Sequence, residues 1–373
     1  MAKQPNLIST NNPSKTNMQP LPPRTDAAFP VDLIRTVAIV LVIFLHAAAF
    51  PYPIPTDITP EVTGNWWTVN VYGAIGRLGV PLFVMLSGAL LLDSSKADEP
   101  LGVFFKKRFN RIGLPMFFWS IAYFAWDFHV HYKPLTIDNI LQGTLSGAYV
   151  HLWFLYLLVG LYLVTPVLRV LVKHLDSKRF KYLLTLWFVG TVTVPFINTF
   201  GSINFNPVFF VFSGWIGIFL LGTFLQNVKV NRRLLILGAV LGLAGAVIGA
   251  YFAAAFVGER VITFFHESLS FNMIVASVSI FLLLTAIPSS KVQSRYGKVN
   301  RLLCWISQNT LPIYLFHIMV LESLEIGFLG LTLNRNILAP IIEVPLITIL
   351  TLILTCLIIY PLNKIPIVKR VIG

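Results

Sequence analysis

VDLIRTVAIVLVIFLHAAAF, residues 31–50, is apolar over almost its whole length and carries two basic side chains, Arg35 and His46. Twenty such residues in an α-helix span the ~30 Å hydrocarbon layer of a bilayer. The eleven-residue spacing of Arg35 and His46 returns them to within about 20° of one helix face, roughly 16 Å apart along the axis. The stretch therefore predicts a membrane-spanning helix with an arginine near one end and a histidine deep in the bilayer.

An ionisable side chain at this depth is costly, and such residues usually mark a functional path through the membrane. The alternative is a packing histidine that bonds to a carbonyl of a neighbouring helix. We treat His46 as a candidate catalytic group and Arg35 as its companion on the same face.

The composition indicates a polytopic membrane protein. The 373 residues are 56% hydrophobic and 12% charged, with a mean hydropathy of +0.77, whereas soluble proteins carry about twice this fraction of charge. The net charge of +13 does not indicate a nucleic-acid partner, because the basic residues recur in alternate connections instead of forming one stripe.

Runs of about twenty apolar residues predict an all-α protein of about ten transmembrane helices. Residues 1–29 are polar and are expected to form a flexible cytoplasmic tail, and residues 30–373 form the transmembrane domain. The expected spans are 31–50, 69–92, 112–130, 151–172, 180–197, 207–226, 234–256, 268–287, 309–331 and 339–361.

The distribution of Lys and Arg predicts the orientation. The connections on one side, together with both termini, hold most of the basic residues and are therefore expected to be cytoplasmic. The opposite connections hold only Lys133, Arg260 and Arg335. An even number of spans with both termini in the cytoplasm fits this alternation.

The stretch FFKKRFNRIGLP (residues 104–115) places Arg108 and Arg111 three residues apart, where the third span leaves the cytoplasm. Membrane anchoring explains the neighbouring lysines, but Arg111 already leads into an apolar segment. A planar guanidinium group can bind two phosphate oxygens at once. Arg35 is expected on the same, cytoplasmic side of the membrane. The three arginines are therefore a candidate phosphate site.

Other polar residues lie in the outer half of the expected bundle. Arg77, within the second span, needs an anionic partner, which a substrate or one of the carboxylates Asp127, Glu322 and Glu325 could supply. His151 and Trp153 open the fourth span, as candidate acceptor-binding residues or as interfacial aromatic-belt residues.

His317 lies inside the ninth span, five residues after Pro312, which is expected to loosen the helix. No phosphate-binding loop, dinucleotide fingerprint, CxxC pair, HExxH or GxSxG motif is present in the sequence. Any chemistry must therefore use intramembrane His, Arg and carboxylate side chains, with no metal expected.

The stretches DLIRTVAIVLVIFLH, RLGVPLFVMLSGALLL, FFKKRFNRIGLP, HLWFLYLLVGLYLVTPVL and TLPIYLFH occur in this order between residues 32 and 317. Through these ordered stretches the chain resembles the acyltransferase-3 family of multispan membrane acyltransferases. Among the members of this family, it looks most like the surface polysaccharide O-acetyltransferases related to the enterobacterial common antigen O-acetyltransferase. The resemblance implies ten helices, a cytoplasmic acyl-CoA donor and an acceptor on the far side. It implies His46 as the catalytic histidine, Arg35 as its companion, and Arg108 and Arg111 as the cytoplasmic arginine motif.

The expected enzyme is a plasma- or inner-membrane O-acetyltransferase that moves acetyl from acetyl-CoA to a hydroxyl of a surface or lipid-linked glycan. Some members of the family carry a hydrolase-like domain after the last span; this sequence lacks one, so the resemblance leads us to expect a stand-alone enzyme. His46 is expected to act as a general base or to accept the acetyl group itself, with His317 orienting it or binding the acceptor. The alternative is a transporter of a glycan or organic anion, because transporters also place His, Arg and Glu at mid-membrane depth.

Overall fold

The computed structural model describes residues 28–48, 60–201, 214–257, 263–287, 297–328, 330 and 338–373. Every regular element within these ranges is helical, as the sequence predicts. The expected tail lies outside the described residues, except that its last two residues begin α1.

The helices follow one another along the chain with short connections. The first half comprises α1 (Ala28–Ala48), α2 (Pro60–Gly76), α3 (Gly79–Leu91), η1 (Ser94–Lys96), α4 (Leu101–Arg108), η2 (Phe109–Gly113), α5 (Leu114–Val130), α6 (Ile137–Ser146) and α7 (Trp153–His174). The second half comprises α8 (Ser177–Phe188), η3 (Val189–Thr193), α9 (Val194–Phe200), α10 (Trp215–Leu225), α11 (Arg232–Phe256), η6 (Phe264–His266), α12 (Phe271–Thr285), α14 (Gly297–Gln308), α15 (Thr310–Glu325), α16 (Pro340–Leu362) and α17 (Pro366–Ile372).

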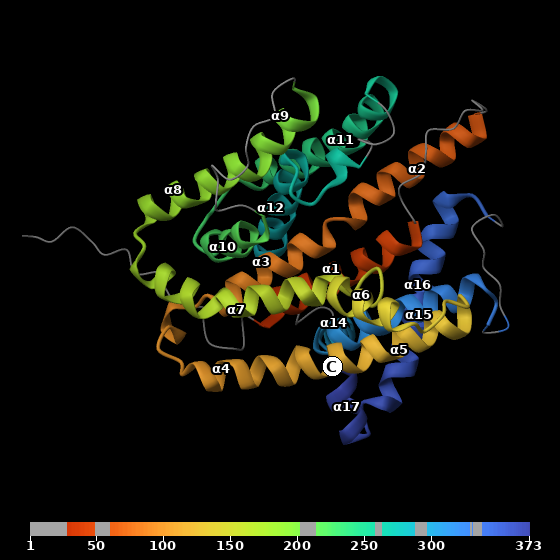
Figure 1. Ribbon diagram of the computed structural model, residues 1–373. Helices are drawn as coiled ribbons and strands as arrows, with labels where there is room; N and C mark the ends of the chain where they lie inside the picture. Colours follow the sequence, from red (N-terminus) through yellow and green to blue (C-terminus); the bar gives the residue numbers. More distant parts are fainter. Residues whose placement is uncertain are drawn as a thin grey trace, which may run out of the picture.

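Helix α1 lies at the centre of the bundle and packs against α2, α3, α12, α14, α15 and α16 (Figure 1). Its buried residues Ile34, Ala38, Val42 and Ile43 are at most 2% exposed. They recur at the spacing of one helix face. The first helix of the sequence is therefore the core of the fold, and Arg35 and His46 are held on a buried element.

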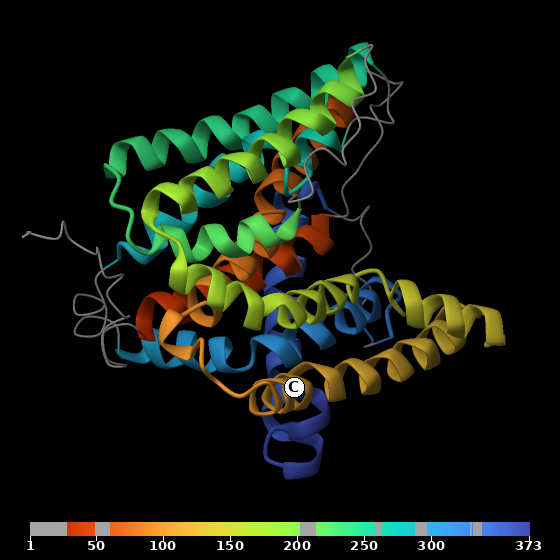
Figure 2. The same ribbon diagram turned by 60° about the vertical axis from the view of Figure 1, so that its left-hand side comes forward.

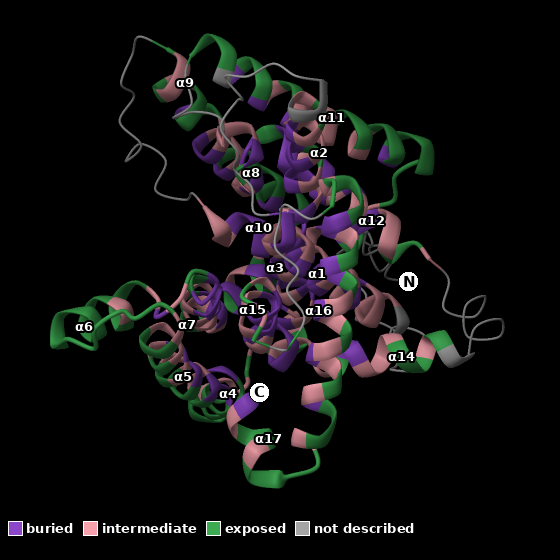
Figure 3. Cartoon of the chain, turned by 90° about the vertical axis from the view of Figure 1, so that its right-hand side faces the viewer, coloured by how far each residue is buried: buried purple, intermediate pink, exposed green. Residues whose placement is uncertain are grey.

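Two groups of helices flank this centre. Figure 2 shows α8–α12, in green to cyan, forming a layer on one side of α1, and α4–α7, in gold to yellow-green, lying with α15 on the other. Figure 3 shows the buried residues concentrated in α1, α3 and α15, whereas α6 and α11 carry exposed residues. The second group and α1 enclose the candidate site described below.

The outward surface is apolar, as a bilayer requires. Large hydrophobic side chains such as Leu241 on α11 and Ile349 on α16 are 60% and 56% exposed, respectively. Seven described helices are long and apolar enough to cross a membrane. They correspond to seven of the ten expected spans, and the described residues of the other three form the shorter or less apolar helices α5, α10 and α15. The count of ten stays a prediction.

The second expected span, which is one of the seven candidates, is interrupted by a turn at residues 77–78. α2 begins at Pro60 and ends at Gly76, and α3 restarts at Gly79, so Arg77 lies at the break. The flanking glycines press on α1: a Cβ at Gly76 would lie 2.7 Å from the Leu45 Cα, and one at Gly79 would lie 2.8 Å from the Ala38 carbonyl oxygen. Glycine is needed at both positions for this approach.

Candidate active site

A cavity of about 890 Å³ lies between α1, α3, α7 and the α14–α15 pair. It is lined by all three arginines predicted to bind phosphates, Arg35, Arg108 and Arg111, and by Lys96. We call it the basic cavity. The rest of its wall includes Phe83, Phe154, Leu158, Tyr162, Ser307 and Tyr314.

The arginine pair lies within one continuous helical segment, residues 101–130, which extends beyond both sides of the pair. Arg108 ends α4, and Arg111 lies in the π-helical turn η2 that joins α4 to α5. Such turns are rare and often occur at functional sites. Here the turn places Arg111 at the basic cavity together with Arg108.

The arginines of the cavity lack carboxylate partners. None of Arg35, Arg108 and Arg111 forms an ion pair within 4.0 Å with any residue that the structure describes. The Arg108 guanidinium lies 5.6 Å from the centre of the Tyr162 ring. Arg35 is near Arg111 and also near Asp32, whose Oδ1 accepts a 2.6 Å hydrogen bond from Ser307. Clustered positive charge of this kind binds anions.

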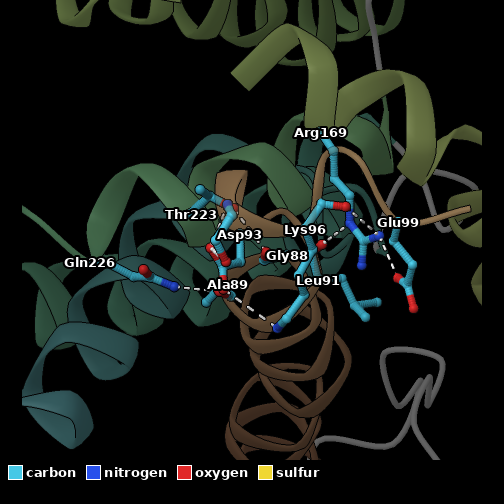
Figure 4. Close-up of polar contacts among 10 residues, drawn as sticks. Gly88, Ala89, Leu91, Asp93, Lys96, Glu99, Arg169, Thr223 and Gln226 are labelled. Carbon is cyan, nitrogen blue, oxygen red and sulfur yellow. Dashed lines mark hydrogen bonds and ion pairs between the residues drawn. The ribbon is translucent and has the colours of Figure 1, made fainter. Parts of the chain in front are cut away.

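The connection that carries Lys96 is held by a buried arginine that the sequence analysis missed (Figure 4). Arg169, which is 2% exposed, donates from Nε to the Leu91 carbonyl oxygen at 2.6 Å and pairs through Nη1 with Glu99 at 2.9 Å. The same Nη1 lies 3.3 Å from the Lys96 carbonyl oxygen. From the sequence, Arg169 is grouped with the basic residues that anchor the cytoplasmic connections. Its position within an apolar helix, three residues after Pro166, was the available signal that its side chain is buried.

Glu99 is bonded twice. Its Oε1 accepts from Lys107 at 2.8 Å while its Oε2 binds Arg169. Hydrogen bonds from Lys107 and then from Arg169 lower the pKa of Glu99 to about 2, so the carboxylate stays ionised.

The end of α3 is also held from the α10 side. The side chains of Thr223 and Gln226 donate hydrogen bonds to the carbonyl oxygens of Gly88 and Ala89, at 2.9 and 2.5 Å, respectively. The end of α3 is therefore fixed from α7 and from α10.

Tyr314, within the stretch TLPIYLFH, lines the basic cavity. The Tyr314 hydroxyl donates to the His151 carbonyl oxygen. Its ring centre lies 5.4 Å from that of His151 and 5.7 Å from that of His317. One residue in the wall of the basic cavity thus contacts two histidines.

The structure brings together three histidines that are far apart in the sequence. The ring centres of His46 and His317 are 5.3 Å apart, those of His151 and His317 are 5.4 Å apart, and those of His46 and His151 are 6.5 Å apart. His151 and His317 are 1% and 0% exposed, so His151 is a core residue and not an interfacial one. We call these three residues the histidine cluster.

The hydrogen bond of His317 determines which ring nitrogen carries the proton in the neutral side chain. Nδ1 lies 2.6 Å from the Tyr314 carbonyl oxygen. A carbonyl can only accept, so Nδ1 carries the proton and a neutral ring keeps its lone pair on Nε2. Nε2 is buried and has no hydrogen-bond partner among the described residues. His317 can therefore accept a proton within the cluster.

Pro312 does not loosen the helix around His317, contrary to the sequence-based expectation. α15 begins at Thr310, so Pro312 lies in its first turn. The backbone N–H groups of a first turn have no partner within the helix, and proline is tolerated there. The real interruption is at Asn309, between α14 and α15.

A second pocket of about 430 Å³ is lined by Asp127, Lys133, Tyr149, Trp153 and Glu322, together with Ser146, Gly147, Ala148 and Val150. Along α15, Tyr314 lines the basic cavity, His317 belongs to the histidine cluster and Glu322 lines the second pocket. The cluster therefore lies between the two cavities. This arrangement suits a reaction between two substrates that arrive from opposite directions.

The candidate acceptor residues have different locations. Trp153, which is 41% exposed, lines the second pocket. Arg77 lines neither the basic cavity nor the second pocket, and its partner is none of the three carboxylates considered from the sequence: Nη1 lies 3.6 Å from Glu267 Oε1. Arg77 therefore lies at the α2–α3 break beside Glu267, and its role in acceptor binding stays a prediction.

The fold and site define a helical membrane protein with a basic cavity, a histidine cluster and a polar second pocket. The acyltransferase-3 family, described as an acyltransferase domain, matches residues 31–360, and the chain belongs to this family. No curated protein matches. No solved structure matches either. Family membership favours a membrane acyltransferase over a transporter.

Proposed function

We propose that the chain transfers an acetyl group from cytoplasmic acetyl-CoA to a hydroxyl of a surface or lipid-linked glycan. The observation that carries the proposal is the sequence of contacts from three arginines, which form no ion pair with any described residue, through the wall of the basic cavity to Tyr314 and the histidine cluster. CoA carries several phosphate charges at one end and its thioester at the end of a long flexible arm. The ~16 Å between Arg35 and His46 along α1 is comparable to the reach of that arm.

Arg35, Arg108 and Arg111 would hold the phosphates, and Lys96 would add a fourth cation at the cavity. The apolar and aromatic wall formed by Phe83, Phe154 and Leu158 would cover the arm. The thioester would then reach Tyr314 and the cluster from the basic side, while the sugar hydroxyl enters from the second pocket.

Two routes for His46 agree with this arrangement. In the direct route, an unprotonated nitrogen of His46 takes the proton of the sugar hydroxyl as its oxygen attacks the thioester carbonyl carbon. The C–S bond breaks, and the CoA thiolate takes the proton back from His46. In the covalent route, His46 attacks the thioester, CoA leaves as the thiol, and the sugar hydroxyl displaces the imidazole to form the ester. His317, whose Nε2 has a lone pair, would hold the proton in transit: it accepts the proton from His46 and returns it, to His46 in the direct route or to the CoA thiolate in the covalent route.

The test uses purified protein in liposomes with acetyl-CoA labelled in the acetyl group. Labelled glycan and stoichiometric free CoA are expected only when donor and acceptor are both present, apart from one equivalent of CoA in the covalent route. Transport of either substrate without release of CoA would contradict the proposal.

A further inference from the structure

We propose that the second pocket binds the sugar unit that accepts the acetyl group and that it selects a neutral or positively charged sugar against an anionic one. The inference rests on the proposed function and names the class of acceptor. It is drawn from the charges that line the pocket and from the place of the pocket beside the histidine cluster.

The positive charge in the pocket is already neutralised. Lys133 Nζ lies 3.0 Å from Asp127 Oδ2, and His131 Nδ1 lies 3.0 Å from Asp127 Oδ1. An anionic sugar would therefore have to compete with Asp127 for Lys133. Displacing Asp127 would leave its negative charge next to the incoming carboxylate or phosphate, and two like charges side by side repel each other.

The negative charge of Glu322 has no cationic partner among the described residues. Its Oε1 accepts from the Tyr149 hydroxyl at 2.5 Å, and its Oε2 accepts from Trp126 Nε1 at 2.7 Å. Both donors are neutral. Desolvation, followed by the hydrogen bond and charge of Glu322, raises the pKa of Tyr149, so this hydroxyl remains a donor. Each carboxylate oxygen keeps acceptor capacity, which suits sugar hydroxyl or ammonium groups and repels an anion.

The pocket also offers an apolar face and a short route to the chemistry. The half-exposed ring of Trp153 can cover the C–H face of a sugar. Tyr149 stacks on Tyr123 with ring centres 4.6 Å apart, and the Tyr123 ring lies 4.8 Å from that of His151. One layer of aromatic rings therefore separates the pocket from the histidine cluster.

The experiment measures equilibrium binding of three methyl glycosides to the full-length protein in detergent micelles by calorimetry. The probes are methyl glucoside, methyl glucosaminide and methyl glucuronide, which differ in charge on one ring scaffold. We expect the glucuronide to bind at least about tenfold more weakly than the other two. Glu322→Gln should reduce this difference to about threefold or less, because it removes the repelling charge.

Glu325→Gln is the matched control, since Glu325 lies one turn further along α15 and does not line the pocket. Any of three results would overturn the proposal. The glucuronide binds as tightly as the other glycosides, none of the three glycosides binds, or the Glu322 and Glu325 substitutions have equal effects. Acetyl-CoA binding and glycan acetylation are measured on the same samples. If acetylation continues while the glycosides are not discriminated, the charge selectivity is wrong and the proposed function stands.

Discussion

His46 and His317 face each other across the contact between α1 and α15, with ring centres 5.3 Å apart. The hydrogen bond of His317 Nδ1 to the Tyr314 carbonyl oxygen leaves His317 Nε2 as a proton acceptor inside the cluster. A pair of imidazoles in this state can pass a proton from one to the other. The pair lies between a cavity that suits the donor and a pocket that suits the acceptor.

His317→Gln should therefore lower kcat by roughly 100-fold, the lower end of the range for a lost proton-transfer group. The KM for acetyl-CoA should stay within about threefold, because His317 does not line the basic cavity. His174→Gln, in the exposed last turn of α7, is the control and should leave both constants unchanged. Equal losses in kcat and donor affinity would instead indicate a packing defect.

Replacing an arginine of the basic cavity should weaken donor binding. Arg111→Ala removes charge-assisted hydrogen bonds worth about 1.5–3 kcal/mol, so the Kd for acetyl-CoA should rise about 10- to 100-fold. Arg111→Lys should restore only part of this, because an ammonium group cannot bind two phosphate oxygens in one plane.

The difference between wild type and Arg111→Ala should shrink at high salt. Lys106→Ala serves as the control, since Lys106 is exposed on the same helical segment and does not line the cavity. Unchanged affinity in both Arg111 variants would reduce this residue to a membrane anchor.

The ion pair of Arg169 and Glu99 should contribute to stability, because removing Glu99 leaves the charge of the buried Arg169 without its carboxylate partner. Glu99→Gln should thus lower the Tm clearly, whereas Asp98→Asn, which breaks an exposed pair with Lys173, should change it little. Differential scanning fluorimetry in detergent measures both.

This stabilisation should also depend on pH. The pKa of Glu99 is lowered in the folded state, to about 2, so its contribution is complete above its usual value near 4.5 and is lost as pH falls towards 2. The gap in Tm between wild type and Glu99→Gln should narrow across that window. A gap that stays constant down to pH 3 would show that Glu99 does not form this pair.

The orientation of the chain follows from its basic connections. A reporter fused after Arg233, at the start of α11, should be cytoplasmic, and one inserted within residues 201–206 should be external. A reversed result at either position would contradict the even number of spans and the assignment of the basic cavity to the cytoplasmic side.

The sequence predicts local features well. The spacing of Arg35 and His46 is decided within one helix, and α1 indeed carries both. The pairing of Arg77 with Glu267 and the burial of Arg169 depend on contacts between distant segments, which periodicity does not contain. His46, His151 and His317 could be recognised singly as costly residues, but their convergence required the packing of α1, α7 and α15.

The role of Tyr314 was missed for a related reason. A tyrosine in an apolar helix resembles any interfacial aromatic residue. Its position three residues before His317 on α15 was the available signal, because residues at this spacing share a face. Tyr123 and Tyr149 gave no comparable signal, since their partners come from other helices.

His46 is proposed to perform the acetyl transfer, and glycan acetylation by a His46→Gln variant is the decisive assay. Glutamine keeps hydrogen bonding but cannot cycle a proton near neutral pH. In liposomes with labelled acetyl-CoA and glycan acceptor, we predict that acetylation falls at least about 100-fold while acetyl-CoA binding and Tm stay near wild type. Near-normal acetylation by His46→Gln would contradict the account and make His46 a packing residue.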